Sequence, residues 1–281
     1  MTYNKFNNPA LKALKTIKKQ IKHKCNPDGF TDFHNFLGYM LTMAALSKDS
    51  VAMASAEILF LYEENHLVHY FLETADLEDF LKNTKVNDIM AIRQMVLLDN
   101  SANNRFFRFE SNGGIDGARS LGGVIHSPTQ HDAVAFVCIR NEKDTSFSIS
   151  AETGDDVVYS GNLLLDDALK SVNSKADDKN QLLPLVVNML LYIQAFPESV
   201  IDKAPEGQAT EYYRNKCHTI RTSSTILEHG GKTPHFRRGH FRLLSSERFI
   251  NKRGQIVFVH SSFVGGKAKT ILDDNVGEDL L

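Results

Sequence analysis

The sequence has no tryptophan, only three cysteines and no long apolar run. Cys25, Cys138 and Cys217 lie far apart, so they form neither a CxxC pair nor a disulfide framework, which is typical of a reducing cytoplasm. Because no run of about 18 apolar residues occurs, we expect no membrane span, and the N-terminus lacks the apolar core of a secretory signal. These absences predict a cytoplasmic protein without a membrane partner.

The short motifs of common cofactor and hydrolase sites are missing as well. The chain has no P-loop, no GxSxG elbow and no dinucleotide fingerprint, and the glycine pair Gly122-Gly123 is expected to punctuate a loop. His66 and His69 follow two glutamates and would share one helical face, but an exposed polar segment is the simpler interpretation. We therefore expect neither a metal site nor a cofactor.

Acidic residues are scarce in two parts of the chain where basic residues gather. Residues 1–24 carry seven lysines and no acid, and residues 214–269 carry twelve basic residues against Glu228 and Glu247. The intervening body is strongly acidic, and the last twelve residues hold four acids and no base. An acidic body with two basic ends indicates binding to nucleic acid or to an acidic protein face.

The first hundred residues predict a helical region (1–100). Apolar residues recur at helical spacing from Pro9, from Thr31 and from about Ser50, and a short helix follows Thr74. We expect the helix from Ser50 to continue to about His69. The first helix carries lysines along one face, and it is either a docked helix with a solvated lysine face or a contact for RNA or the ribosome.

The central region (101–213) switches to period-two alternation. Strands are expected at 105–109, 124–126, 133–139 and 146–149, and the short turns between them favour an antiparallel sheet. Residues 181–196 are the most apolar segment and predict a buried helix across that sheet, and further helices are expected at 163–172 and 211–220. The predicted fold class is α+β, with a helical N-terminal region, a central antiparallel sheet covered by an apolar helix, and a small basic β-rich C-terminal module.

The C-terminal module (214–272) precedes an acidic tail (273–281) and contains the most basic stretch of the chain. The stretch Lys232–Arg242 holds three arginines, two histidines and two phenylalanines but no acid. As an extended strand after Pro234, it places Arg238, His240 and Arg242 on one face. A row of such donors binds phosphate well, whereas the plainer interpretation is a basic edge strand that discourages aggregation. A further strand is expected at 255–259, and a strand or turn follows from Ser262.

The sequence leaves three functional hypotheses open, and they differ in the role of this module. In the first, the chain binds RNA through a basic surface, with Phe236 or Phe241 stacking on bases or packing. The residues expected to contact nucleic acid are Arg237, Arg238, His240, Arg242, Arg248, Lys252 and Arg253. In the second, the chain is a ribonuclease with His235 or His240 as general acid or base. In the third, it is an inhibitor that binds protein through its acidic body, and the basic module is only structural.

The motif Pro234-His235-x-Arg237-Arg238-Gly239-His240, followed by the strand ending at Val259, resembles the C-terminal module of a family of phage- and plasmid-borne proteins. One member of that family is a type V-A anti-CRISPR protein that acts on the mRNA of its target effector during translation. The apolar helix at 181–196 is also similar to the helix upstream of that module. The resemblance covers the architecture of most of the chain, and its specific part is the C-terminal motif.

The resemblance implies recognition of a protein during its synthesis, coupled to loss of its mRNA. The first hypothesis is accordingly an anti-CRISPR-like regulator from a phage or mobile element, acting in the cytoplasm of a bacterial host. Its expected partners are RNA, or the ribosome with its nascent polypeptide, and a host protein target. Direct RNA cleavage and recruitment of a host nuclease both remain open.

Overall fold

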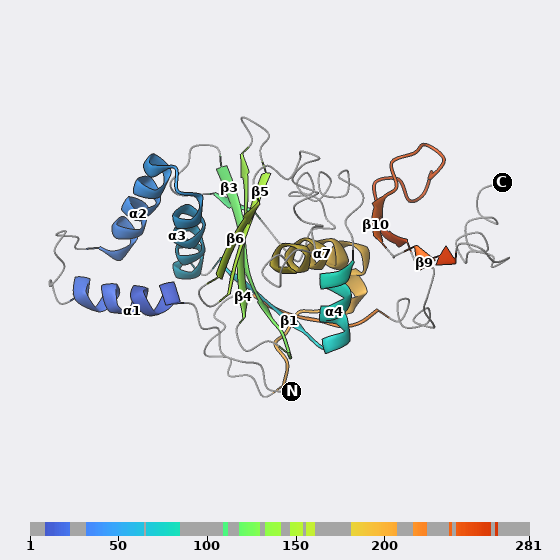
Figure 1. Cartoon of the computed structure of the whole chain (residues 1–281), viewed down its shortest axis with the longest axis horizontal. Helices are drawn as coiled ribbons and strands as arrows, with labels where there is room; N and C mark the ends of the chain where they lie inside the picture. Colours follow the sequence, from blue (N-terminus) through green and yellow to red (C-terminus); the bar gives the residue numbers. More distant parts are fainter. Residues whose placement is uncertain are drawn as a thin grey trace.

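The computed structural model describes residues 9–22, 32–64, 66–84, 109–111, 118–129, 133–141, 147–153, 156–160, 181–206, 216–223, 236–237, 240–259 and 262–263. Within these ranges the chain is a mixture of helices and sheet, as the sequence predicts. Figure 1 shows α1, α2 and α3 on one face of the sheet, α7 and α4 on the other, and the short C-terminal strands beyond α7.

The three N-terminal helices begin where the sequence predicts. They are α1 (Pro9–Lys22), α2 (Phe33–Ser47) and α3 (Ser50–Glu63). The carboxylates of Asp32 and Asp49 accept backbone N–H groups in the first turns of α2 and α3, each at 3.0 Å, which satisfies donors that a helix start leaves open. One face of α3 packs against α1 and α2, and its opposite face packs on the sheet. This helix therefore connects the two outer helices to the sheet.

The part of the sheet that lies within the described residues has eight strands and is mixed. Its order is β6-β5-β4-β3-β1-β8-β7, with β2 added on β3. The strands are β1 (Val68–Leu72), β2 (Glu110–Ser111), β3 (Ala118–His126), β4 (Val134–Asn141), β5 (Phe147–Thr153), β6 (Asp156–Ser160), β7 (Val200–Ile201) and β8 (Cys217–Ile220). The strands of the central region pair antiparallel, as predicted, but β1 runs parallel to both β3 and β8, so the sheet as a whole is mixed and not antiparallel throughout.

Strands β1 and β8, which the sequence analysis did not predict, explain this difference. All five residues of β1 are buried, so the strand has no polar face and gives no period-two signal; its apolar residues merge with those of α3. The segment predicted as a helix at 211–220 ends in β8 instead. Residues 68–72 and 217–220 therefore belong to the same sheet as the central region, across the boundaries expected at 100 and 213.

The apolar helix α7 (Leu182–Ala195) confirms its prediction. Every side chain from Leu182 to Ile193 is buried, and the helix packs on the sheet face formed by residues such as Tyr70 and Phe136. The short helix α4 (Ala75–Asn83) lies beside it, with Thr74 as N-cap. Asn188 of α7 donates to the carbonyls of Leu81 and Thr84 at 2.7 and 2.8 Å, so α7 caps the end of α4.

The glycine pair expected in a loop lies inside β3. A β-carbon at Gly122 would come within 2.5 Å of Leu61, and one at Gly123 within 2.6 Å of the Phe136 ring. The glycines therefore allow α3 on one face and the aromatic side chains on the other to approach the strand closely. This requirement belongs to tertiary packing and is invisible in the local sequence.

The C-terminal strands form two separate pairs. Strand β10 (His240–Leu243) pairs with β11 (Ile256–Val259), and β9 (Phe236–Arg237) pairs with β12 (Ser262–Phe263). The strands expected near 256–259 and 262–263 are confirmed, but the single strand expected after Pro234 is divided between two small sheets. The predictions for 105–108, 163–172 and 273–281 lie outside the described residues. In the described part of the chain, every helix is too short or too polar to cross a membrane.

Candidate nucleic-acid interface

The β10–β11 hairpin is attached to the body through aromatic side chains. Phe241 is fully buried, and its ring centroid lies 5.2 Å from that of Phe258. Phe258 also contacts Phe80 of α4 at 5.0 Å and Phe196, which follows α7, at 6.4 Å. Aromatic pairs at these distances add to the stability that apolar burial supplies. The hairpin is therefore seated on the α4–α7 layer.

Backbone hydrogen bonds order the loop at the tip of this hairpin. Leu244 donates to the carbonyl of Gln255 at 3.0 Å, and Gly254 donates back to the carbonyl of Leu244 at 2.8 Å. Turns within the loop are closed by bonds from Phe249 to Ser246 and from Lys252 to Phe249, each 3.1 Å. Gly254 has a φ of +83°, a conformation that glycine adopts without steric cost. The tip is thus organised before any ligand arrives.

Four cationic side chains project from this hairpin. Arg242, Arg248, Lys252 and Arg253 are all exposed, whereas Glu247 is the only acidic residue between 240 and 259. Within the described residues, none of the four cations forms an ion pair with a carboxylate. Their charge is therefore available to an anion from outside.

The aromatic residues of the hairpin do not offer open ring faces. Phe241, which was expected either to stack on bases or to pack, is buried, so it packs in the core and is unavailable to a base. Phe249 is half-buried, and the guanidinium of Arg248 lies 4.8 Å above its ring. The side chain of Phe236 lies outside the described residues.

The structure brings part of the predicted site together. Arg242, Arg248, Lys252 and Arg253 share one hairpin, as described above. Arg237 and His240 have a described backbone, in β9 and β10, but their side chains lie outside the described residues. The same holds for the whole of Arg238 and His235. The ribonuclease hypothesis, which rests on the two histidines, therefore stays a prediction.

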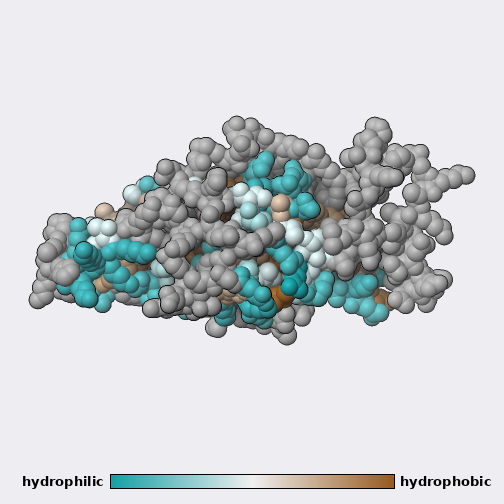
Figure 2. Space-filling model, turned by 90° about the horizontal axis from the view of Figure 1, so that it is seen from below, coloured by the Kyte–Doolittle hydropathy of each residue, from teal (hydrophilic) through white to brown (hydrophobic). Residues whose placement is uncertain are grey.

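A second basic surface lies on α1, at the opposite end of the molecule in Figure 1. Lys15, Lys19 and Lys22 are exposed, and Figure 2 shows hydrophilic surface over this helix. Lys18 is engaged internally, because it pairs with Glu63 and lies 4.9 Å from the ring centroid of Phe33. Ile21 of α1 is buried in a cluster with residues of α2 and α3. The exposed lysines of α1 therefore have the arrangement expected of a solvated surface.

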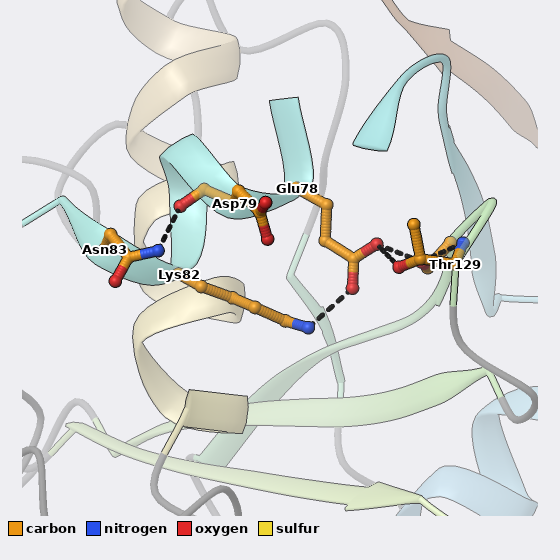
Figure 3. Close-up of polar contacts among 6 residues, drawn as sticks. Glu78, Asp79, Lys82, Asn83 and Thr129 are labelled. Atoms are coloured by element: carbon orange, nitrogen blue, oxygen red, sulfur yellow. Dashed lines mark hydrogen bonds and ion pairs between the residues drawn. The ribbon is translucent and has the colours of Figure 1, made fainter. Parts of the chain in front are cut away.

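A buried charged cluster, which we name the Glu78 cluster, escaped sequence reasoning. The carboxylate of Glu78 is fully buried; Lys82 lies 2.6 Å from one oxygen, and the hydroxyls of Ser127 and Thr129 donate to the other (Figure 3). Burial opposes ionisation, but these hydrogen bonds and the charge of Lys82 outweigh it and hold the pKa of Glu78 below its usual value. In the sequence, the only sign of the ion pair between Glu78 and Lys82 is their spacing of four residues on a predicted helix.

A pair of buried histidines lies at the end of β3, next to Ser127 of the Glu78 cluster. His69 Nδ1 and His126 Nε2 are 2.9 Å apart, and the His126 ring stacks on Phe71 at 4.4 Å. Burial lowers the pKa of His69 to about 4, so His69 is neutral at pH 7. His66 is exposed and precedes β1, so it shares no helical face with His69. Among the described residues, no three metal-ligating side chains gather.

The described cysteines are poor nucleophiles. Cys138 lies within β4, where burial raises the pKa of its thiol, in keeping with a core residue. Burial also raises the pKa of Cys217 to about 11. Because the thiolate is the reactive form, neither residue supplies covalent chemistry at neutral pH.

The described residues define a protein of mixed helices and sheet, with a mixed sheet and a basic surface hairpin. Comparisons of the chain with protein-family models, with curated proteins and with solved structures give no match. The functional argument therefore depends on the chemistry of the hairpin.

Proposed function

We propose that this chain binds RNA, alone or on the translating ribosome, through the β10–β11 hairpin. The observation that carries the proposal is a rigid hairpin with four exposed cations and no carboxylate partner among the described residues. Guanidinium and ammonium groups bind phosphate oxygens strongly, and release of counterions from the nucleic acid drives the association. The acidic body would orient the basic hairpin toward the polyanion.

We further propose that this binding lowers the expression of a host target during its translation. The support is the resemblance of the C-terminal motif to the anti-CRISPR-containing family, together with the basic surface. The chain would then act in the bacterial cytoplasm, as an anti-defence regulator of a phage or mobile element. Expression of the chain in a host, followed by parallel measurement of protein and transcript levels, would identify the target as the pair that falls together.

The direct test is the salt dependence of RNA binding, measured by fluorescence anisotropy. The variant R248A/K252A/R253A should bind more weakly, and the slope of log K against log salt should fall by about two units, since each lost phosphate contact removes roughly 0.7–0.9. K48A/K203A is the matched control, because both lysines are exposed and lie outside the hairpin. An unchanged slope in the triple variant would remove the hairpin from the proposal.

A second candidate function, protein binding, is favoured by the exposed face of α2. Tyr39, Met40, Met43 and Leu46 are 43–73% exposed, which is unusual for neighbouring large apolar side chains on one helix. Methionine-rich faces adapt to varied partners, so a nascent polypeptide suits this surface. The variant M43S/L46S should lose a partner that the native chain retains after nuclease treatment, whereas a partner lost with the RNA would assign the interaction to the hairpin.

A further inference from the structure

The hairpin itself indicates which form of nucleic acid it binds, given the proposed function on which this inference rests. Proteins that bind single strands generally combine a basic groove with exposed aromatic rings on which the unpaired bases stack. Proteins that bind duplexes instead contact phosphates and the shape of a groove. The position of the aromatic rings therefore distinguishes the two classes.

Among the described residues of the hairpin, no aromatic side chain is exposed. Phe241 is buried, Phe258 packs on Phe80 and Phe196, and the ring of Phe249 lies under Arg248. The large exposed apolar side chain of the hairpin is aliphatic: Ile250 is 81% exposed. Among the described residues, the one aromatic among the large exposed apolar side chains is Tyr39 of α2, on the other side of the sheet (Figure 1). A stacking surface for single-stranded bases is thus missing from the described tip.

The cations are distributed along both arms of the hairpin. Arg242 lies in β10, and Arg248 lies in the loop before Ile250. Lys252 and Arg253 lie in the loop after Ile250. A two-stranded ribbon is narrow enough to enter a nucleic-acid groove, whose walls are two rows of phosphates. Cations that precede and follow the tip of the loop can reach both of these rows, whereas a single strand offers one.

Ile250 occupies the tip between these two sets of cations. An aliphatic side chain at such a position can contact the floor of a groove or insert between base pairs, as apolar residues do in many groove-binding proteins. The hydrogen bonds that close the loop reduce the ordering cost of binding, because they already restrict the backbone of the tip.

We infer that the β10–β11 hairpin enters the groove of a double helix, with Arg248, Lys252 and Arg253 on the phosphates and Ile250 against the bases. Base-paired RNA and base-paired DNA both present two rows of phosphates, although their grooves differ in width and depth. The experiment must therefore include both duplexes.

The test uses the full-length chain and three labelled probes of equal length: duplex RNA, duplex DNA of the same sequence, and single-stranded oligo(U). We expect at least one duplex to bind about tenfold more tightly than oligo(U). The preferred duplex identifies the source of the phosphates. Binding of oligo(U) as tight as that of both duplexes would overturn the inference while leaving the proposed function intact, whereas binding of no probe would overturn both.

The variant I250S separates the tip contact from the electrostatic contacts. Its affinity for the preferred duplex should fall about fivefold with an unchanged salt slope, because the lost contact is apolar, while oligo(U) binding should not change. E247Q serves as the control, since removal of the one hairpin acid should strengthen binding to all three probes. An unchanged duplex affinity in I250S would overturn the placement of Ile250 in the groove and with it the inferred geometry.

Discussion

The Glu78 cluster and the His69–His126 pair are two buried polar groups at the same end of β3, and they are stabilised in opposite ways. His126 and Ser127 are adjacent in sequence, yet His126 contacts the ring of His69 and Ser127 donates to a buried carboxylate. The carboxylate is accompanied by a lysine and two hydroxyls, whereas burial keeps His69 neutral. Of these two groups, the one that carries a charge is the one that donors surround, which offsets the cost of burying it.

Removal of the cation from the Glu78 cluster should produce the largest effect. The variant K82M leaves Glu78 buried and ionised with hydroxyl donors alone, so the free energy of unfolding at pH 7 should fall by about 3 kcal/mol. Urea denaturation measures this loss. The loss should shrink at pH 3.5, where protonation of Glu78 removes the unpaired charge; an equal loss at both pH values would show that packing causes it. K203M, at an exposed lysine, is the control.

Acid should destabilise the histidine pair in a different pH range from the Glu78 cluster. The pKa of His69 is about 4 in the folded chain and 6.5 in the unfolded chain, so the unfolded state binds the proton first as the pH falls. The free energy of unfolding should therefore fall between pH 6.5 and 4, by up to about 3 kcal/mol. Glu78 has a lowered pKa, so its contribution is lost only at pH values below about 4.5.

Urea titrations at pH 7, 5 and 3.5 separate these two contributions. The variant H69Q should abolish most of the change between pH 7 and 5, because it removes the group that titrates there. H66Q, at an exposed histidine, should leave that change intact. A native-like pH dependence in H69Q would assign the acid sensitivity to other groups.

Loss of a single hydroxyl donor should have the smallest effect. S127A removes one hydrogen bond to the carboxylate while Lys82 and Thr129 remain, so the free energy of unfolding should fall by about 1.5 kcal/mol. The pKa of Glu78 should also rise toward its usual value, which carboxylate NMR titration measures directly. A pKa that does not move in S127A would mean that Lys82 alone sets the charge state.

The elements that were predicted correctly are those whose signal is local. The apolar run of α7 and the capping residues of α2, α3 and α4 mark their own helices, and the density of arginine and lysine identified the exposed cations of the hairpin. The parallel strand β1 was missed because burial on both faces removes its alternation. The contact of Glu78 with Ser127 joins residues 49 positions apart, so no local pattern encodes it.

The seating of Phe258 against rings from α4 and the end of α7 has a consequence for how the hairpin can be used. A synthetic peptide that copies the hairpin alone would leave this ring in water and would lack the surface that aligns its two arms. Under the proposed function, binding of a nucleic acid would therefore require the folded α4–α7 layer as well as the hairpin.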